Sequence, residues 1–277
     1  MFRSSALLLA GVTGLTSIVA AMPATAMQAP PGARMSQDFP PFEKISEGFT
    51  EVAPADGGRG MYRVWVNKKT QRSLAELPRN FEKQDLFMAW TVASGVETSA
   101  VQTGDQYARW KRFGKRLALV EPNYAVISSG DKQSKDATQR VFTDRVILEV
   151  PILAMGPGGG PVIDLNALFV NKATSFFGRV AAGANTRLAT VEKAKTFPGN
   201  VELCYQMPLA TGRFAKLYYS IASIPSSTGY RPREADDRVG YFTTSIQDLG
   251  DPAADTPWKR YVNRWQLEKA APSRKMS

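Results

Sequence analysis

The sequence predicts a mainly β protein of the β-rich α+β class, with antiparallel sheets in a sandwich or an open barrel and a few short helices. Three observations predict this class. Segments that alternate polar and apolar residues, or that are rich in β-branched and aromatic residues, recur along the chain. Glycine and proline occupy the intervals between these segments. Hydrophobic residues make up 43% of the chain, which is enough for a core.

Residues 1–26 have the features of a signal peptide. Arg3 gives a basic start, residues 6–21 form a short apolar run, and Ala24-Thr25-Ala26 is the small-x-small pattern that signal peptidase recognises. The apolar run is shorter than the roughly 20 residues that a membrane-spanning helix needs. We therefore expect cleavage after Ala26, a secreted or periplasmic protein, and no membrane span.

Three further regions are predicted after the signal peptide. Residues 27–60 contain "MQAPPGARMSQDFPPFEK" and "PADGGRG", and this density of proline and glycine predicts a mobile leader without regular structure. The phenylalanines of the leader can still dock on a neighbouring part of the fold. We expect the β-rich domain at residues 61–245 and a linker at residues 246–277, whose ending "APSRKMS" is polar and basic.

The first strands of the predicted domain are marked by apolar runs at residues 61–66, 85–95, 106–129 and 145–155. Gly114-Lys115 is a plausible hairpin turn, because apolar residues lie on both sides of it. Pro151 lies inside the fourth run and indicates an edge strand or a bulge.

The "GPGGGP" segment at residues 156–161 is predicted to be a long flexible turn between strands. A phosphate-binding loop would end in Gly-Lys-Ser/Thr and begin a helix, and this segment does neither. Residues 164–178 are the best helix candidate, with Asp164 as the cap. Two short turns around Asn171 are the alternative for this segment.

The clearest hairpin is predicted at residues 200–225, where two alternating arms flank "ATGR". One face of the second arm carries Leu217, Tyr219 and Ile221, which we expect in the core rather than on a ligand platform. Cys204 is the only cysteine of the chain, so no disulfide framework is expected. A small buried side chain on a strand is the expected role of this cysteine.

The chain contains no histidine, which excludes Ser-His-Asp and Cys-His catalytic arrangements. Carboxylate-only chemistry such as glycoside hydrolysis remains open, but no pair of acids is singled out by the sequence. The formal net charge is +10, with basic and acidic residues interspersed. We expect no nucleic-acid partner, and an anionic envelope surface remains a candidate.

Five segments resemble, in order, a family of large secreted bacterial zinc-dependent metalloproteases. They are "FTDRVILEVPILAM", "GGGPVIDLNALFV", "FPGNVEL", "YYSIASIPSSTGYRPREADDRVGYFTTSIQDLG" and "RYVNRWQLEK". The resemblance covers about residues 61–270, to an uncharacterised N-terminal domain that precedes a metzincin-like domain with a His-Glu-x-x-His helix. The segments "PREADDRVGYF" and "RYVNRWQLEK" are its most specific parts.

This resemblance implies a non-catalytic N-terminal domain that supports or orients a zinc-metalloprotease-like catalytic domain, in cis or in trans. No catalytic or metal residue of the family can be carried onto this chain, so we expect no cofactor here, zinc only in the catalytic domain, and no activity from the chain by itself. The chain would be truncated before the catalytic domain or would be a free-standing domain. The alternative function is a free-standing secreted β-rich binding module for a glycan, a peptide or an envelope surface.

The resemblance also favours an interdomain contact near the end of the chain. The predicted contact residues are Arg233, Asp236, Asp237, Arg238, Tyr241, Phe242, Tyr261, Arg264 and Trp265. Arginine–carboxylate pairs would hold "RPREADDRVGYF" in one shape, and Val239 to Phe242 would continue as a strand. An ordinary surface loop is the alternative reading, and a calcium loop is a weaker one. Residues 258–269 are compatible with a helix or a strand.

Overall fold

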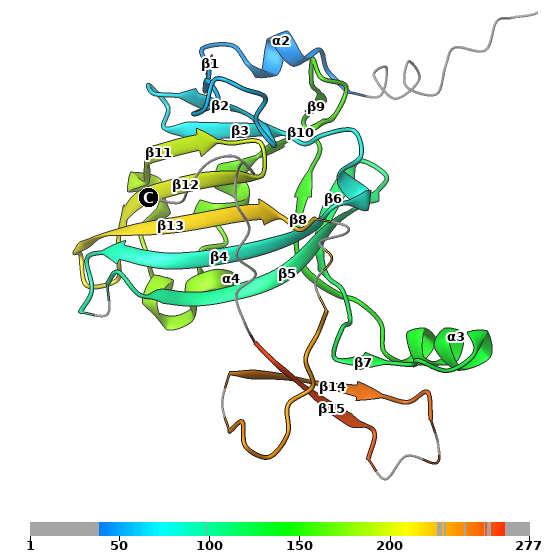
Figure 1. Cartoon of the computed structure of the whole chain (residues 1–277). Coiled ribbons are helices and arrows are strands. Elements are labelled where there is room, and N and C mark those ends of the chain that lie inside the picture. Colours follow the sequence, from blue (N-terminus) through cyan, green and yellow to red (C-terminus); the bar gives the residue numbers. More distant parts are fainter. Residues whose placement is uncertain are drawn as a thin grey trace, which may run out of the picture.

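The computed structural model describes residues 39–97, 99–225, 229, 231–240, 242–251, 253 and 256–263. The predicted signal peptide lies outside these residues. Three sheets and several short helical turns make up the described part of the chain (Figure 1). The predicted class, mainly β with antiparallel sheets and few short helices, is confirmed, and none of the described sheets closes into a barrel.

The largest sheet has seven antiparallel strands in the order β11-β12-β13-β4-β5-β6-β8. These are β4 (Asp85–Ser94), β5 (Gln102–Phe113), β6 (Arg116–Glu121), β8 (Arg145–Pro151), β11 (Thr190–Thr196), β12 (Asn200–Pro208) and β13 (Phe214–Ser223). Both predicted hairpins are confirmed. Gly114 turns between β5 and β6 with φ of 59°, a value that favours glycine. Pro151 ends β8, which is an edge strand as predicted.

A five-stranded sheet is ordered β1-β2-β3-β10-β9. Its strands are β1 (Thr50–Glu51), β2 (Arg63–Asn67), β3 (Arg72–Glu76), β10 (Pro161–Asp164) and β9 (Ala154–Met155). Helix α2 (Phe42–Ile45) precedes it. The prediction that residues 27–60 lack regular structure is therefore wrong for α2 and β1, while the docking of phenylalanines is confirmed. Phe42 packs on Trp65 with ring centroids 4.9 Å apart, because the apolar residues of this segment share one side.

Short helical turns cover the core between the sheets. They are the π-helical turn Asn166–Val170, α4 (Thr174–Phe177) and the 3₁₀ turns Gly178–Ala181, Phe81–Lys83 and Thr186–Leu188. The predicted helix at residues 164–178 thus consists of two short turns around Asn171. Asp164 caps the first one, since its Oδ1 accepts hydrogen bonds from the Asn166 N–H at 2.9 Å and the Ala167 N–H at 3.3 Å. Phe169 packs against Tyr219 of β13, with ring centroids 4.5 Å apart.

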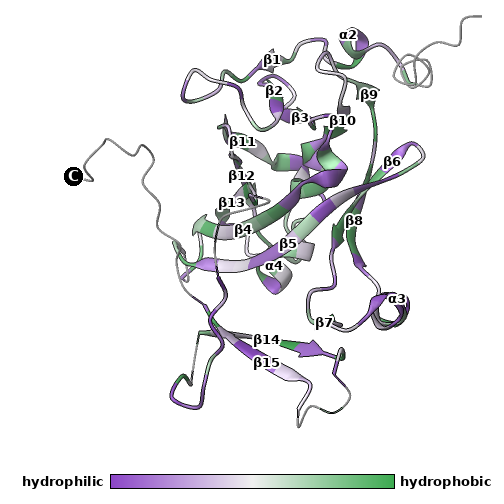
Figure 2. Cartoon of the chain, turned by 45° about the vertical axis from the view of Figure 1, so that its right-hand side comes forward, coloured by the Kyte–Doolittle hydropathy of each residue, from purple (hydrophilic) through white to green (hydrophobic). Residues whose placement is uncertain are grey.

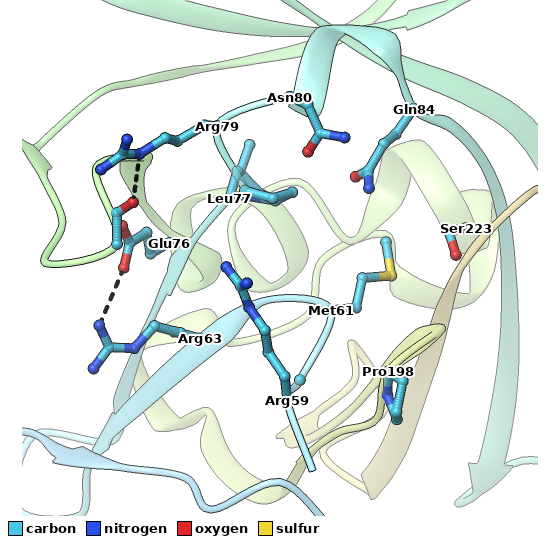
Figure 3. A pocket seen from close by; sticks show the side chains of 13 residues that line it. Arg59, Met61, Arg63, Glu76, Leu77, Arg79, Asn80, Gln84, Pro198 and Ser223 are labelled. Atoms are coloured by element: carbon cyan, nitrogen blue, oxygen red, sulfur yellow. Dashed lines mark hydrogen bonds and ion pairs between the residues drawn. The ribbon is translucent and has the colours of Figure 1, made fainter. Parts of the chain in front are cut away.

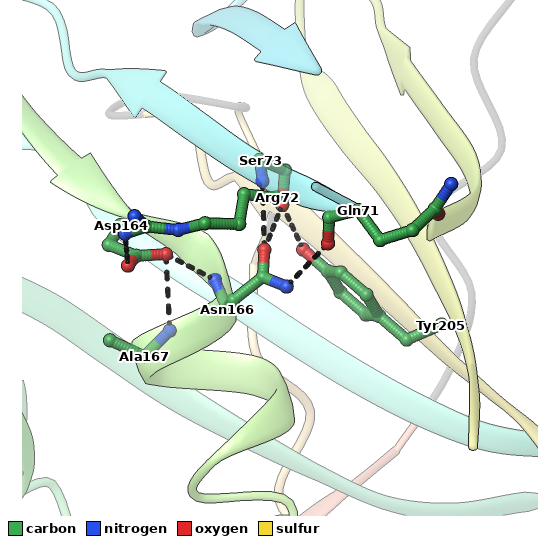
Figure 4. A network of polar contacts seen from close by, with 7 residues as sticks. All are labelled: Gln71, Arg72, Ser73, Asp164, Asn166, Ala167 and Tyr205. Atoms are coloured by element: carbon green, nitrogen blue, oxygen red, sulfur yellow. Dashed lines mark hydrogen bonds and ion pairs between the residues drawn. The ribbon is translucent and has the colours of Figure 1, made fainter. Parts of the chain in front are cut away.

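A buried polar network joins the two larger sheets (Figure 4). Asn166 Oδ1 accepts hydrogen bonds from the backbone N–H and the hydroxyl of Ser73, both at 2.8 Å. The Ser73 hydroxyl also lies 2.7 Å from the Tyr205 hydroxyl of β12. Arg72 and Asp164 form an ion pair beside it. These hydrogen bonds connect β3, β12 and the π-helical turn and fix their positions relative to one another. We call the five- and seven-stranded sheets with their helical turns the body.

The third sheet has three strands in the order β15-β14-β7, and we call it the C-terminal sheet. Its strands are β15 (Trp258–Val262), β14 (Thr243–Asp248) and β7 (Val126–Ile127). β14 pairs antiparallel with β15 and parallel with β7. The predicted boundary at residue 245 therefore falls inside β14, and the predicted linker contains β15. Of the two readings of residues 258–269, the strand is confirmed over residues 258–262.

Helix α3 (Lys132–Val141) follows β7 and was not predicted. Its sequence, "KQSKDATQRV", has no apolar periodicity, and Thr138 is its one buried residue. The Asp131 side chain caps it by accepting a hydrogen bond from the Ser134 N–H at 2.8 Å. No helix among the described residues is long and apolar enough to cross a membrane.

Candidate functional site

The predicted contact residues that the structure describes lie on and beside the C-terminal sheet. Tyr241, Arg264 and Trp265 fall outside the described residues. The segment that begins with Arg233 runs along the outer edge of β15. The Val262 N–H donates to the Arg233 carbonyl at 2.9 Å, and the Ala235 N–H donates to the Arg260 carbonyl at 2.7 Å. The structure thus brings together the two segments that sequence reasoning had linked only through the resemblance.

Two arginine–carboxylate pairs shape this edge. Arg238 Nε donates to Asp236 Oδ1 at 2.9 Å, and this hydrogen bond lowers the pKa of the Asp236 carboxyl to about 2. Arg260 of β15 donates to Asp237 Oδ1 at 3.1 Å. The predicted arginine–carboxylate pairing is confirmed for Arg238 with Asp236. Both pairs are exposed to solvent, so they orient the loop and contribute little to the stability of the fold.

The predicted strand from Val239 to Phe242 is wrong. The Val239 N–H donates to the Asp236 carbonyl at 3.0 Å, which makes a turn. Phe242 has φ of 56°, a left-handed conformation that interrupts a strand. β14 begins only at Thr243. The turn arises because the Asp236 side chain also accepts a hydrogen bond from the Arg238 N–H at 3.0 Å, which competes with extended backbone.

Asp248 anchors the C-terminal sheet to the segment between β6 and β8. Its Oδ1 accepts hydrogen bonds from the Ser129 N–H at 2.8 Å and the Gly250 N–H at 3.0 Å, and Lys259 Nζ lies 2.7 Å from its Oδ2. These donors hold the pKa of Asp248 well below its usual range, with Lys259 the largest cause. Sequence reasoning missed Asp248. Its signal is the Asp-x-Gly spacing, which is typical of an aspartate that accepts hydrogen bonds from its own turn.

The C-terminal sheet buries almost nothing apolar. Within the described residues of β7, α3, β14 and β15, Thr138 and Asp248 are the buried residues, and no hydrophobic side chain is buried. Figure 2 shows hydrophobic residues concentrated in body strands such as β4 and β8, whereas β15 is mostly hydrophilic. Trp258 is 56% exposed, and it shares one face of β15 with Arg260 and Val262 by strand alternation. Phe242, just before β14, is 74% exposed.

The described part of the chain has no cluster of side chains placed to bind a metal, and its thiol is buried. No group of three or more cysteine, aspartate or glutamate residues there is placed to hold a metal ion. Cys204 is buried in β12, and burial raises the pKa of its thiol. It is a small core residue, as predicted.

The comparison with protein families adds a classification. A family model described as "Domain of unknown function (DUF5117)" matches residues 100–270. The chain belongs to the DUF5117 family. The match contains β5 to β15, and so includes the whole C-terminal sheet and every predicted contact residue. The DUF5117 chain matches no curated protein and no solved structure.

Proposed function

We propose that this DUF5117 chain is a secreted, non-catalytic domain that supports and orients a zinc-metalloprotease-like catalytic domain. Two things support the proposal. The first is the resemblance of "PREADDRVGYF" and "RYVNRWQLEK" to the domain that precedes the protease unit in that family. The second, which carries the proposal, is that described parts of these segments lie at the C-terminal sheet: Arg260 to Val262 belong to β15, and Arg233 to Ala235 run along its outer edge. This sheet buries no hydrophobic side chain within the described residues and exposes Trp258.

A sheet of this kind gains stability from a partner. Three strands are independently stable when a hydrophobic face is packed against another element, and the C-terminal sheet lacks such a face. Trp258 is 56% exposed, so covering it would remove roughly 80–140 Å² of surface from water, which contributes on the order of 2–3 kcal/mol. Arg260 on the same face adds a planar donor group that suits a polar rim. The proposed partner surface is therefore apolar at its centre and acidic at its edge.

The alternative of a free-standing binding module rests on exposed aromatic residues of the hairpin at residues 200–225 and on the basic net charge of the chain. Tyr205 and Tyr219 of that hairpin are fully buried. Tyr219 donates a hydrogen bond to the Phe169 carbonyl at 2.7 Å and contributes its ring to the core. Tyr205 and Tyr219 therefore serve packing, whereas Phe214 is exposed and Tyr218 is half-buried beside Lys193. We favour the C-terminal sheet because the segments that carry the resemblance lie at it.

Affinity capture with the full chain tests the proposal. Extracts of the envelope and culture fluid of the source organism would be passed over the immobilised chain, and bound proteins identified by mass spectrometry. We expect enrichment of a protein with a His-Glu-x-x-His helix, and loss of it with Trp258→Glu. Phe113→Glu is the matched control, because Phe113 is 52% exposed at the end of β5 in the body. Equal capture by the two variants, or capture of a glycan alone, would refute the proposal.

A second test concerns the chain by itself. Incubating it with zinc and an unfolded protein substrate should give no metal-dependent cleavage, since the usual zinc site requires histidine and the sequence has none. Zinc-dependent cleavage that disappears with a chelator would contradict a non-catalytic role.

A further inference from the structure

A cavity of about 790 Å³ lies in the body, far along the sequence from the C-terminal sheet (Figure 3). Its walls come from the segment before β2, from the end of β3 and the turn after it, from the "GPGGGP" segment, and from the open ends of β11 and β13. The lining residues are Arg59, Gly60, Met61, Arg63, Glu76, Leu77, Pro78, Arg79, Asn80, Gln84, Gly158, Pro198 and Ser223. Most of them precede residue 100, where the match to the DUF5117 family model begins.

The "GPGGGP" segment forms a rigid wall of this cavity. It is a turn between β9 and β10, as predicted, but hydrogen bonds hold it. The Gly160 N–H donates to Glu76 Oε1 at 2.9 Å, and the Gly156 N–H donates to the Gly160 carbonyl at 2.8 Å. A Cβ atom on Gly156 would overlap the Glu76 carboxylate, and one on Gly160 would overlap the Leu77 carbonyl. The glycines are therefore required by close approach to β3, and the predicted flexibility is wrong.

Two of the three arginines in the lining have no carboxylate partner among the described residues. Arg63 is shared by two acids, since it forms two hydrogen bonds of 2.8 Å with Glu51 and lies 3.7 Å from Glu76. Glu76 is 3% exposed, so its carboxylate interacts with Arg63 and the "GPGGGP" segment rather than with solvent. Arg59 and Arg79 form no ion pair with any described residue, and they leave the cavity with uncompensated positive charge.

The side chain of Arg79 and the backbone around Arg59 are held by hydrogen bonds. Arg79 Nε donates to the Gly158 carbonyl at 2.8 Å, which fixes the guanidinium plane and leaves its two terminal amino groups to other acceptors. Arg59 lies on a segment pinned on both sides, since the Ala55 N–H donates to the Thr196 carbonyl at 3.0 Å and the Met61 N–H donates to the Phe197 carbonyl at 2.6 Å. A fixed donor such as the Arg79 guanidinium loses less conformational freedom on binding.

We propose that this cavity binds a small organic anion, whose carboxylate, sulfate or phosphate group is held by Arg59 and Arg79. The guanidinium fork matches the oxygens of these groups, and charge-assisted hydrogen bonds are the strong ones. Pro78 and Pro198 offer apolar surface for the rest of the ligand, and Asn80 supplies a neutral polar group. The volume lies within the roughly 300–1,000 Å³ of small-molecule sites.

Isothermal titration of the full chain with citrate, inorganic phosphate and sulfate, at constant ionic strength, tests this site. We expect saturable binding of at least one probe. The double variant Arg59→Ala/Arg79→Ala should bind it at least about tenfold more weakly. Arg187→Ala/Arg213→Ala removes the same charge from exposed positions outside the cavity and should bind like the unchanged chain.

A third variant separates the cavity from general charge effects. Gln84→Trp fills the cavity without changing the net charge, and it should weaken binding by at least about tenfold while thermal melting shows a folded protein. The proposal is overturned if no probe binds saturably, if the two double-arginine variants lose affinity equally, or if folded Gln84→Trp binds as tightly as the unchanged chain.

Discussion

The body and the C-terminal sheet are both built from paired strands, but they are stabilised in opposite ways. In the body, β12 and β13 together bury large side chains such as Tyr205, Leu217 and Tyr219. In the C-terminal sheet, β14 buries one residue, Asp248, and β15 buries none. The body is stabilised by its own buried hydrophobic side chains and needs no partner chain. The C-terminal sheet is held by backbone pairing and one carboxylate, so a partner chain can still add stability to it. This difference is why our proposal places the contact with a partner protein on the C-terminal sheet.

The largest effect is expected from a substitution in the hydrophobic core of the body. Phe169→Ala removes a fully buried ring that contacts Tyr219 and Phe176, and it should lower the free energy of unfolding by about 3–5 kcal/mol. Urea denaturation followed by tryptophan fluorescence measures this loss. Phe169→Leu, which keeps most of the volume, should cost clearly less. A cost below about 1 kcal/mol for the alanine variant would show that the core does not stabilise the body.

Alkali should act next most strongly, and on the body. Burial raises the pKa of Tyr62, Tyr205 and Tyr219 well above the ordinary value near 10. Below about pH 10 these tyrosines are neutral in both the folded and the unfolded chain. Above it they ionise in the unfolded chain but not in the folded one, which lowers the free energy of the unfolded chain. Each of these tyrosines should therefore cost about 1 kcal/mol of stability per pH unit above roughly pH 10. Unfolding free energies measured from pH 8 to 11 check this, and a flat profile would contradict it.

Replacing Asp248, or lowering the pH, should destabilise the C-terminal sheet. Asp248→Asn weakens the hydrogen bonds to Ser129 and removes the ion pair with Lys259, which should cost the sheet about 1–2 kcal/mol. Hydrogen exchange measures this, with faster exchange of β14 amides and unchanged exchange in β12. Since the pKa of Asp248 is lowered, the same protection should be present above about pH 4 and be lost progressively as the pH falls further.

Asp237→Asn is the matched control for that experiment. Asp237 pairs with Arg260 on the exposed edge of the same sheet, so its loss should leave β14 exchange unchanged. Equal acceleration by both variants would mean that any negative charge near the sheet suffices.

The smallest effect on stability should come from replacing the exposed Trp258. Trp258→Ala should change the unfolding free energy of the isolated chain by less than about 0.5 kcal/mol, because the indole has little packing to lose. The same variant should lose partner capture. A large destabilisation of the isolated chain would show that Trp258 packs within this protein, and it would weaken the docking proposal.

Local sequence signals predicted the features that depend on local chemistry. The hairpins at Gly114-Lys115 and residues 210–213, the two turns around Asn171 and the pair between Asp236 and Arg238 are all contained in short segments. Helix α3 escaped prediction because it has no apolar face, and only the cap at Asp131 marks its start.

Features that depend on distant partners could not be predicted. β14 lies beside β7, whose residues are far earlier in the chain, and nothing in either segment specifies the other. The cavity has the same origin, since Arg59, Arg79 and Gly158 come from separate segments. The interpretation of "GPGGGP" as a flexible turn failed for this reason: its glycines are explained by Glu76, which lies in another strand.

The parallel pairing of β7 with β14 has a consequence for the order of folding. Gln247 pairs with Val126 across a long stretch of sequence, as β13 pairs with β4 inside the body, and such contacts form slowly. The contacts of the body bury hydrophobic side chains, whereas the described strands of the C-terminal sheet bury none. The last body strand, β13, ends at Ser223, before β14 begins. We expect the body to fold first and the C-terminal sheet to assemble on it last, so pulse-labelled refolding should protect β12 amides before those of β14. A nascent chain would then complete its stable half before its recognition surface exists.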